Sequence, residues 1–267
     1  MKTILITGAS TGLGKASALL FASKDWNVIA TMRNPAAGAE LASIPNITVL
    51  PLDVTNSRQI EETIKKATDL YPVDILFNNA GYGLMGPLEG YSDEQITRQM
   101  NTNFMGVVRV TKAILPYMRE RRSGMIITTT SIGGLITYPL SSLYHATKWA
   151  LEGWSESMSH ELAMHNITIK TVAPGGISTD FIGRSLDLAK HEDYDLLFQK
   201  LVSGINDPNG ALQFGTPESI ASVVFEAATD GKDQLRYVAG EDALAMYAQR
   251  LKLGNEVFRQ QMSAQFK

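Results

Sequence analysis

The chain has 267 residues, of which 44% are apolar, a formal net charge of −3 and no cysteine. This length and composition suffice for one large α/β domain, or two small ones, with a substantial core. The interspersed charges exclude a basic nucleic-acid-binding stripe and a disordered tail of like charge, and the lack of cysteine excludes disulfides, thiolate catalysis and cysteine-ligated zinc.

The first residues, MKTILITGAS, contain one short apolar run of the length of a buried strand. A signal peptide needs about 7–15 consecutive apolar residues, and no window of the chain approaches a membrane span. We therefore expect a soluble, cytoplasmic protein.

Up to residue 175 the chain alternates short β-rich runs with longer segments of helical period. Strands are predicted at 3–7, 26–31, 47–54, 73–79, 124–131 and 167–174, and helices at 13–24, 57–70, 93–119 and 142–165. This alternation indicates βαβ units and a parallel sheet, and the almost wholly apolar strands indicate helices on both faces. We therefore predict a single α/β domain over residues 1–267, a Rossmann fold with a doubly wound parallel sheet of about seven strands.

The stretch 179–215 breaks this alternation, because it mixes the helical pattern DYDLLFQKLVS with the loop residues NDPNG. Ligands of doubly wound sheets bind at the carboxyl ends of the strands, so an insertion after the sixth strand is placed to act as a substrate lid. An ordinary pair of surface helices is the alternative. A capped helix (TPESIASVVFEAATD), a short strand near 236–239 and a C-terminal helix from about Asp242 are predicted to follow.

The first strand runs directly into the glycine-rich stretch TGASTGLG. Gly8 permits a tight turn, and Gly12 allows backbone N–H groups to approach a pyrophosphate at the positive end of the next helix. Gly14 allows this helix to pack closely on the sheet. The spacing differs from G-x-G-x-x-G, and simple turn punctuation is the alternative, but the position between strand and helix favours a dinucleotide-binding loop.

The pattern Thr-Gly-x-x-x-Gly-x-Gly at the first strand resembles the cofactor loop of the short-chain dehydrogenase/reductase family. Further motifs follow in that family's order: NNAG at 78–81, the helix NTNFMGVVRVTKAILP, a serine 13 residues before the tyrosine of YHATK, and PGGIST at 174–179. The resemblance covers about residues 1–185. With the tail LRYVAGEDA, the motifs look like the carbonyl-reductase and 17β-hydroxysteroid-dehydrogenase-like branch, an analogy that does not identify a steroid substrate.

The resemblance implies four catalytic residues: Asn103, Ser131, Tyr144 and Lys148. It also implies that the NNAG turn lines the adenosine ribose, that Asp53 contacts the adenine and that Thr179 and its loop hold the nicotinamide carboxamide. The cofactor-binding residues expected from the loop and the resemblance are Gly8, Ser10, Thr11, Gly12, Leu13, Gly14, Arg33, Asp53, Val54, Asn79, Ala80, Gly81, Tyr144, Lys148, Pro174, Gly175, Ile177 and Thr179. The chain departs from the family in two places: Thr129 and Thr130 stand where serines are common before the catalytic serine, and His145 follows the tyrosine. Thr130 is an alternative to Ser131, but the spacing to Tyr144 favours Ser131.

Tyr144 and Lys148 stand four residues apart on a predicted helix and therefore share one face. A phenol titrates near pH 10, and a nearby ammonium is expected to lower its pKa toward the working range of a general acid–base. We expect Ser131 to hold a substrate oxygen while Tyr144 exchanges a proton with it and hydride moves to or from the adjacent carbon. The resemblance adds that Lys148 holds the nicotinamide ribose and that Asn103 holds a water linking Lys148 to solvent.

The end of the second strand, ATMRNP, bears on the choice of cofactor. NAD enzymes of this kind place an acidic residue here to bond the ribose hydroxyls, whereas this chain has Met32 followed by Arg33. An arginine pairs well with a 2′-phosphate, and Ser10 or Thr11 can assist with a hydroxyl donor. We therefore expect NADP(H) to be favoured and NAD(H) to be possible, with a solvated loop charge as the alternative for Arg33.

The candidate lining of the substrate pocket is mostly apolar: Leu84, Met85, Ile132, Leu135, Tyr138, Leu140, Ile177, Phe181 and Ile182. Each is alternatively plain core, but together they favour a ketone or secondary alcohol with hydrophobic substituents. The four histidines show no metal-ligand spacing, and the three on or beside helix 142–165 are expected at the surface. The same helix carries Trp149 and Trp154, which indicates a homodimer or homotetramer.

Three other functions are consistent with parts of the pattern. A non-catalytic dinucleotide-sensing protein needs the glycine loop but not the serine, tyrosine, lysine and asparagine together. A methyltransferase also has a glycine-rich first turn but gives no reason for NNAG or for Tyr-x-x-x-Lys. An epimerase or dehydratase is disfavoured because the chain has no extra substrate domain.

Overall fold

The computed structural model describes residues 1–178, 186–205 and 214–266. Its centre is a seven-stranded sheet in the order β3-β2-β1-β4-β6-β7-β9, with every neighbouring pair parallel. The strands are β1 Thr3–Thr7, β2 Asn27–Met32, β3 Ile47–Pro51, β4 Ile75–Asn78, β6 Gly124–Thr129, β7 Ile167–Pro174 and β9 Arg236–Ala239. The strand order reverses between β1 and β4, which confirms the predicted doubly wound Rossmann fold.

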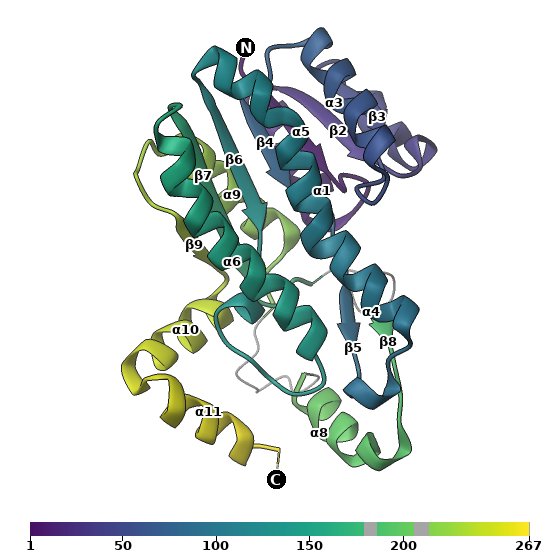
Figure 1. The fold of residues 1–267 in the computed structure, drawn as a ribbon, viewed down its shortest axis with the longest axis vertical. Helices are drawn as coiled ribbons and strands as arrows, with labels where there is room; N and C mark the ends of the chain where they lie inside the picture. Colours follow the sequence, from purple (N-terminus) through teal and green to yellow (C-terminus); the bar gives the residue numbers. More distant parts are fainter. Residues whose placement is uncertain (179–185, 206–213, 267) are drawn as a thin grey trace.

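Helices cover both faces of this sheet (Figure 1). One face carries α3 Ser57–Leu70, α4 Asp93–Met100, α5 Gly106–Arg121 and α6 Ser142–Ala163, and the other carries α1 Gly12–Ser23 and α9 Pro217–Thr229. A short α2, Ala39–Ala42, precedes β3. The predicted helix 93–119 is divided into α4 and α5 by a π-helical turn at Asn101–Met105.

Alternate residues of the central strands supply the two halves of the core. Ile4 and Ile6 of β1 pack toward α1 and α9 with Phe21 and Val224, whereas Leu5 between them packs toward α3 and α5. Both faces of β1 are therefore apolar, as parallel strands between two helix layers require.

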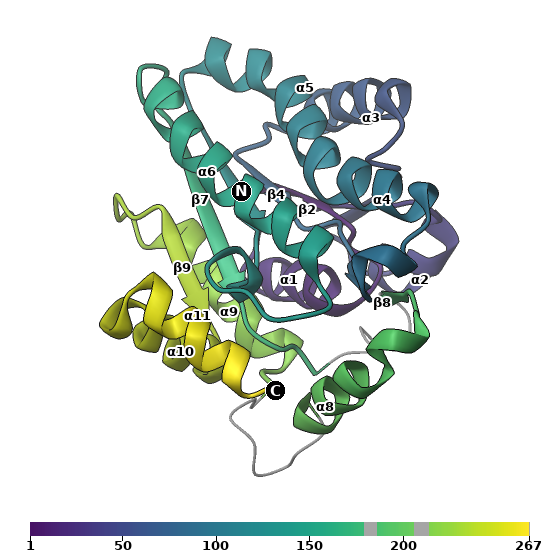
Figure 2. The ribbon, with the colours of Figure 1, turned by 60° about the horizontal axis from the view of Figure 1, so that its bottom comes forward.

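The carboxyl ends of the strands face a region built from later parts of the chain (Figure 2). The helix pair α10 Glu241–Leu253 and α11 Asn255–Ala264 lies on one side, and α8 Asp195–Ile205 lies on the other. A small parallel sheet, β5 Gly83–Met85 with β8 Leu186–Leu188, joins the segment after β4 to the segment before α8. This second sheet was not predicted.

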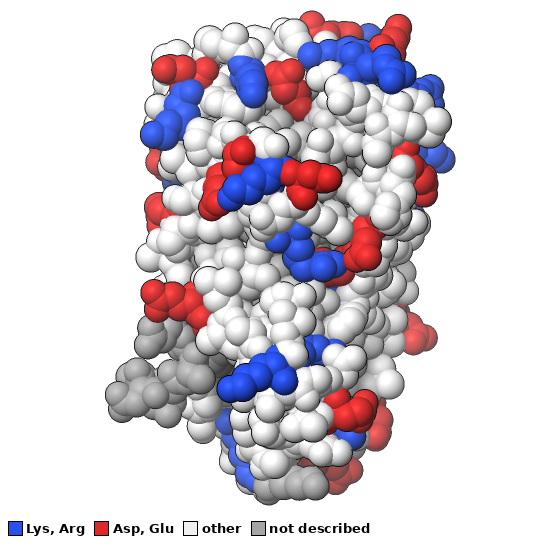
Figure 3. Space-filling model, turned by 90° about the vertical axis from the view of Figure 1, so that its left-hand side faces the viewer, with Lys and Arg blue, Asp and Glu red and all other residues white. Residues whose placement is uncertain are grey.

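The proposed lid at 179–215 is only partly visible, because 179–185 and 206–213 lie outside the described residues. The helical pattern in it is confirmed as α8. Where the structure describes the chain, no helix is long and apolar enough to cross a membrane. Acidic and basic side chains alternate over the face shown in Figure 3, as the sequence indicated.

Candidate active site

The glycine loop joins β1 to α1 with backbone conformations that favour glycine. Gly8 and Gly12 have φ values of +68° and +53°. A Cβ on Gly14 would lie 2.3 Å from the carbonyl oxygen of Gly8 and 2.6 Å from Nδ2 of Asn79. Gly14 therefore has no room for a side chain, and the first turn of α1 lies directly against the loop.

Thr7 and Asn79 connect the glycine loop to the NNAG turn. The Thr7 hydroxyl accepts hydrogen bonds from the backbone N–H groups of Asn79 and Ala80, at 2.9 and 3.0 Å. In return, the Asn79 amide donates to the carbonyl oxygens of Thr7 and Gly8, both at 3.1 Å. The ends of β1 and β4 are thus fixed to each other.

The N-terminus of α1 has the features of a phosphate-binding end. The residue before the helix, Thr11, is exposed and its side chain makes no capping hydrogen bond, and the first turn contains no acidic residue. Uncapped N–H groups at the positive end of a helix attract anions. The loop therefore fits a pyrophosphate, with Ser10 half-buried beside it and Leu13 turned into the core.

The adenine side of the predicted site is formed by the ends of β2 and β3. Met32 is 3% exposed and packs against Gly38, whereas Arg33 is exposed and, among the described residues, has no carboxylate within ion-pair distance. Asp53 accepts hydrogen bonds from the backbone N–H and the hydroxyl of Thr55, at 2.9 and 2.7 Å. Val54 is buried, so only its backbone is placed to meet a ligand.

Asn103 lies in the π-helical turn and is almost fully buried. Its side-chain oxygen accepts from the backbone N–H of Tyr82 at 3.0 Å, and its amide donates to the carbonyl oxygen of Tyr82 at 2.8 Å. A Cβ on Gly81 would lie 3.2 Å from the same oxygen. The side chain thus holds the segment after NNAG, in a π-helical turn of the kind often found at functional sites.

The structure brings Ser131, Tyr144 and Lys148 together at the carboxyl end of β6. The amine of Lys148 lies 5.7 Å from the centroid of the Tyr144 ring and donates to the carbonyl oxygen of Thr129 at 2.9 Å. The Ser131 side chain is close enough to Tyr144 to lower the pKa of its phenol in part. Thr130 donates instead to the carbonyl oxygen of Val172, so Ser131 is the hydroxyl that faces Tyr144.

The pKa values differ from the simple expectation. Burial raises the pKa of Tyr144, and the Ser131 side chain offsets this only in part. Burial also lowers the pKa of Lys148 to about 8, against the opposing effect of Glu152. The net lowering expected for the pKa of Tyr144 is therefore not found in the protein in this state, because loss of solvent around the phenol is the largest effect on it.

The loop after β7 is held by a carboxylate that the sequence analysis did not identify. Asp242, buried in the first turn of α10, accepts from the backbone N–H of Gly176 at 2.8 Å. A Cβ on Gly175 would lie 2.2 Å from its other oxygen. The N–H of Gly175 donates to Ala239 at the end of β9. The contacts with Asp242 and with the end of β9 thus fix the backbone at Pro174 and Gly175. Thr179 lies outside the described residues.

Four of the nine predicted pocket residues are buried. Leu84, Ile132, Leu135 and Leu140 are buried, and the middle two pack with the C-terminal helices. Met85, Tyr138 and Ile177 are half-buried near the strand ends, and Phe181 and Ile182 are not among the described residues.

The expectation for the histidines is wrong at one position, because His145 is buried beneath the loop that follows Ser131. No pattern in the sequence indicated this, because exposed Ala146 and Trp149 lie close to buried His145 on the same helix.

A parallel α/β sheet with a glycine loop at its first strand defines a dinucleotide-binding protein, and the Ser131, Tyr144 and Lys148 cluster lies at the same sheet edge. Residues 2–188 match the family model described as short chain dehydrogenase. The chain belongs to the short-chain dehydrogenase/reductase family and is an NAD(P)-dependent oxidoreductase.

The chain is 38% identical over 229 residues to an uncharacterized oxidoreductase of Schizosaccharomyces pombe, covering 85% of this chain and 96% of that protein. It is 40% identical over 195 residues to a 3-ketodihydrosphingosine reductase of Bacteroides thetaiotaomicron, covering 72% of this chain and 71% of that protein. Among solved structures it is similar to ElxO with NADP bound, with 29% identity, a TM-score of 0.77 and coverage of 91% of this chain and 99% of that one.

Proposed function

We propose that the protein transfers hydride between NADP(H) and a ketone or secondary alcohol with hydrophobic substituents, with Tyr144 as general acid–base. The observation that carries this proposal is the convergence of Ser131, Tyr144 and Lys148 at the sheet edge where the glycine loop ends. When bound, the nicotinamide accepts or donates the hydride. The residues of the chain supply position and proton transfer.

In the reductive direction, Tyr144 donates its proton to the carbonyl oxygen of the substrate. The raised pKa of the phenol keeps it protonated at neutral pH, which suits a proton donor. Ser131 orients the oxygen through its hydroxyl, and the ammonium of Lys148 stabilises the phenolate that remains. We propose that Asn103 contributes by fixing the segment after NNAG and the π-helical turn.

The cofactor is held by the loop Gly8, Ser10, Thr11, Gly12 and Gly14 at the pyrophosphate and by Pro174, Gly175 and Ile177 at the nicotinamide. The exposed Arg33, with buried Met32 in place of an acidic residue, supports recognition of a 2′-phosphate. The likeness to ElxO, which was solved with NADP bound, supports the same preference.

Two observations support the substrate class. The half-buried residues near the site, Met85, Tyr138 and Ile177, present no charged group to a substrate. The similar 3-ketodihydrosphingosine reductase is named for the reduction of a ketone. Both points favour a ketone with apolar substituents. A homodimer or homotetramer through α6 remains part of the proposal, to be tested by light scattering after size-exclusion chromatography.

The test is a panel of ketones and secondary alcohols followed at 340 nm with both cofactors, on the parent and on Tyr144→Phe. We expect the substitution to reduce kcat by about 10²- to 10⁴-fold while the Kd of NADPH stays unchanged. Tyr117→Phe is the matched control, because Tyr117 contacts Arg121 at the opposite end of the sheet. Parent protein that binds NADPH but turns over no substrate in the panel would instead favour the non-catalytic sensor.

A further inference from the structure

His145 follows Tyr144 in α6 and is 4% exposed. Both of its ring nitrogens lie at hydrogen-bond distance from the backbone of the loop between Ser131 and Tyr138. Nδ1 is 2.7 Å from the carbonyl oxygen of Gly133, and Nε2 is 3.2 Å from the backbone nitrogen of Tyr138. A single imidazole thus joins the two ends of this loop.

The two partners determine the protonation state of the ring. A carbonyl oxygen can only accept and a backbone N–H can only donate, so Nδ1 must carry the proton and Nε2 must carry the lone pair. This tautomer is neutral. Burial lowers the pKa of His145, and this favours the same neutral form.

Gly133 links the imidazole to Ser131. Its carbonyl oxygen faces Nδ1 of His145, and its N–H donates to Oγ of Ser131 at 3.0 Å. A Cβ on Gly133 would lie 3.0 Å from Nδ1 and 3.3 Å from that Oγ. The three groups are in close contact, so a shift of the ring displaces the glycine and changes the position of the hydroxyl.

The hydrogen bond from Gly133 also determines how Ser131 can act. A hydroxyl donates one hydrogen bond and accepts up to two. Because the Gly133 N–H occupies an acceptor position, the Ser131 proton remains available for a substrate oxygen or for Tyr144. At the other end of the loop, the rings of His145 and Tyr138 meet edge to face, with centroids 4.3 Å apart.

We propose that His145 is a positioning residue, whose neutral Nδ1–H tautomer fixes the Ser131 hydroxyl through Gly133 and holds Tyr138 beside the site. This role rests on the proposed function, because it gives Ser131 its geometry for that reaction. His145 itself touches neither substrate nor cofactor in this scheme.

Two substitutions separate the two halves of the imidazole. The amide of His145→Asn places a donor near the position of Nδ1 and keeps the bond to Gly133, whereas the longer His145→Gln places an acceptor near Nε2 and keeps the bond to Tyr138. We expect kcat to fall less than about 5-fold in the first variant and about 10- to 100-fold in the second, since small misplacements at a reaction centre have effects of this size. The Kd of NADPH, measured by its fluorescence, should stay near the parent value, and the Tm should fall by a similar amount in both variants, because each leaves one buried backbone group without a partner.

The Ser131→Ala background distinguishes positioning from a general structural role. If His145 acts through Ser131, His145→Gln lowers kcat there less than 2-fold, because the hydroxyl that it positions is gone. An equal loss in both backgrounds, or full activity of His145→Gln in the parent background, overturns the proposal. Failure of the proposed function is seen separately, as a parent without turnover or as unchanged activity of Tyr144→Phe.

A second readout needs no activity. Imidazole ¹⁵N NMR at pH 7 should show the His145 proton on Nδ1 in the parent. The chemical shift of the Gly133 backbone amide should change in His145→Gln but not in His145→Asn. A proton on Nε2, or on both nitrogens, contradicts the proposed geometry.

Discussion

The amine of Lys148 donates to the carbonyl oxygen of Thr129 across 2.9 Å, at the last residue of β6. The strand end, rather than a carboxylate, thus holds this buried lysine. Burial lowers the pKa of Lys148 to about 8, because the charged amine has lost most of its water, and Glu152 offsets this only in part. The site therefore retains a buried charge that reduces the stability of the folded chain at neutral pH.

Replacing Lys148 by methionine should separate stability from activity. We expect kcat to fall by about 10²- to 10⁴-fold. The folded-state pKa is lower than the usual value of about 10.4, so the unfolded chain binds more protons between these two values and the stability of the parent rises there with pH. Between pH 8 and 9.5 the free energy of unfolding of the parent should gain up to about 1.4 kcal/mol per pH unit relative to Lys148→Met.

Urea denaturation at half-unit steps of pH measures this difference. Lys66→Met, which removes an exposed lysine from α3, is the control and should run parallel to the parent. Parallel curves for Lys148→Met and the parent would show that the amine titrates normally in the folded state.

Asp242 should be required for cofactor binding although it lies in the C-terminal part of the chain. Its carboxylate is the acceptor for the Gly176 N–H, and one of its oxygens has no partner among the described residues. We expect Asp242→Ala to lose about 1–3 kcal/mol of unfolding free energy, since a buried donor is left unsatisfied, and to raise the Kd of NADPH about 10-fold or more. Fluorescence titration and urea denaturation measure the two effects.

The control is Glu241→Ala, which removes an exposed carboxylate from the same helix turn. It accounts for the loss of a favourable charge at the helix N-terminus, which is worth only about 0.3–1 kcal/mol at the surface. Equal effects of the two substitutions would assign the result to the helix and not to the contact with Gly176.

The main sheet could be predicted because each of its strands carries its own local signal. The ends of β1, β7 and α3 coincide with the predicted bounds. This is because the signals that mark them are local in sequence: an apolar run marks a strand, and a cap such as Asn56, which accepts from the backbone N–H of Gln59, marks the start of a helix. The resemblance also named Ser131, Tyr144 and Lys148, which lie together at the end of β6, and their catalytic roles stay a prediction.

The contacts that could not be predicted join distant parts of the chain. β5 and β8 are three residues each and pair across about a hundred positions, so neither has enough local pattern to stand out. Asp242 meets Gly176 only because β9 lies beside β7. The C-terminal helix was predicted as one, whereas Gly254, with a φ of +75°, divides it into α10 and α11.

Arg33 should determine the choice between the two nicotinamide cofactors. If the exposed guanidinium binds the 2′-phosphate, Arg33→Ala loses a charge-assisted hydrogen bond worth about 1.5–3 kcal/mol. The Km for NADPH should then rise about 10- to 100-fold while the Km for NADH changes less than 2-fold. The NADH value is an internal control for folding, and a proportional rise in both would contradict recognition of the phosphate by this residue.

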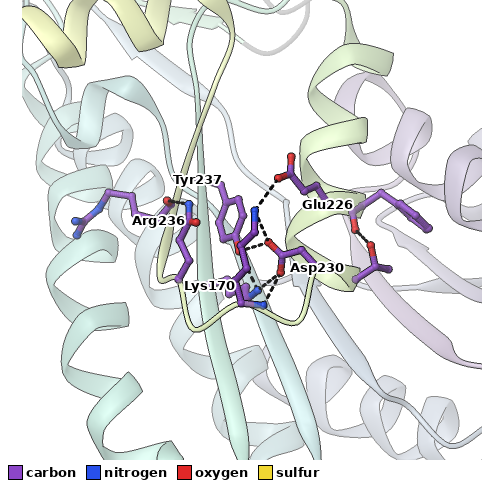
Figure 4. A network of polar contacts seen from close by, with 9 residues as sticks. Lys170, Glu226, Asp230, Arg236 and Tyr237 are labelled. Atoms are coloured by element: carbon purple, nitrogen blue, oxygen red, sulfur yellow. Dashed lines mark hydrogen bonds and ion pairs between the residues drawn. The ribbon is translucent and has the colours of Figure 1, made fainter.

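A buried ion pair joins Lys170 of β7 to Asp230 at the C-terminal end of α9, and it gives a prediction for acid stability (Figure 4). Lys170 is 1% exposed, and its amine lies 2.9 Å from Asp230 and 3.0 Å from the Tyr237 hydroxyl, which itself donates to Asp230 at 2.7 Å. Burial alone would raise the pKa of Asp230, but the hydrogen bonds from Lys170 and Tyr237 outweigh it and hold that pKa well below its usual range.

Asp230→Asn should therefore lower the free energy of unfolding at pH 7 by about 3–5 kcal/mol, because Lys170 is left buried without its counter-charge. The folded pKa of Asp230 lies below the unfolded value of about 3.9, so its contribution is complete above that pH and is lost as the pH falls toward the folded value. The gap between parent and variant should be constant from pH 5 to 7 and should shrink below pH 4.

Urea denaturation measures this gap, with Asp69→Asn as the control. The carboxylate of Asp69 is 61% exposed and pairs with Lys65, so its loss should change stability by less than about 0.5 kcal/mol. A gap that persists unchanged at pH 3, or losses of equal size in the two variants, would mean that the ion pair does not stabilise the fold.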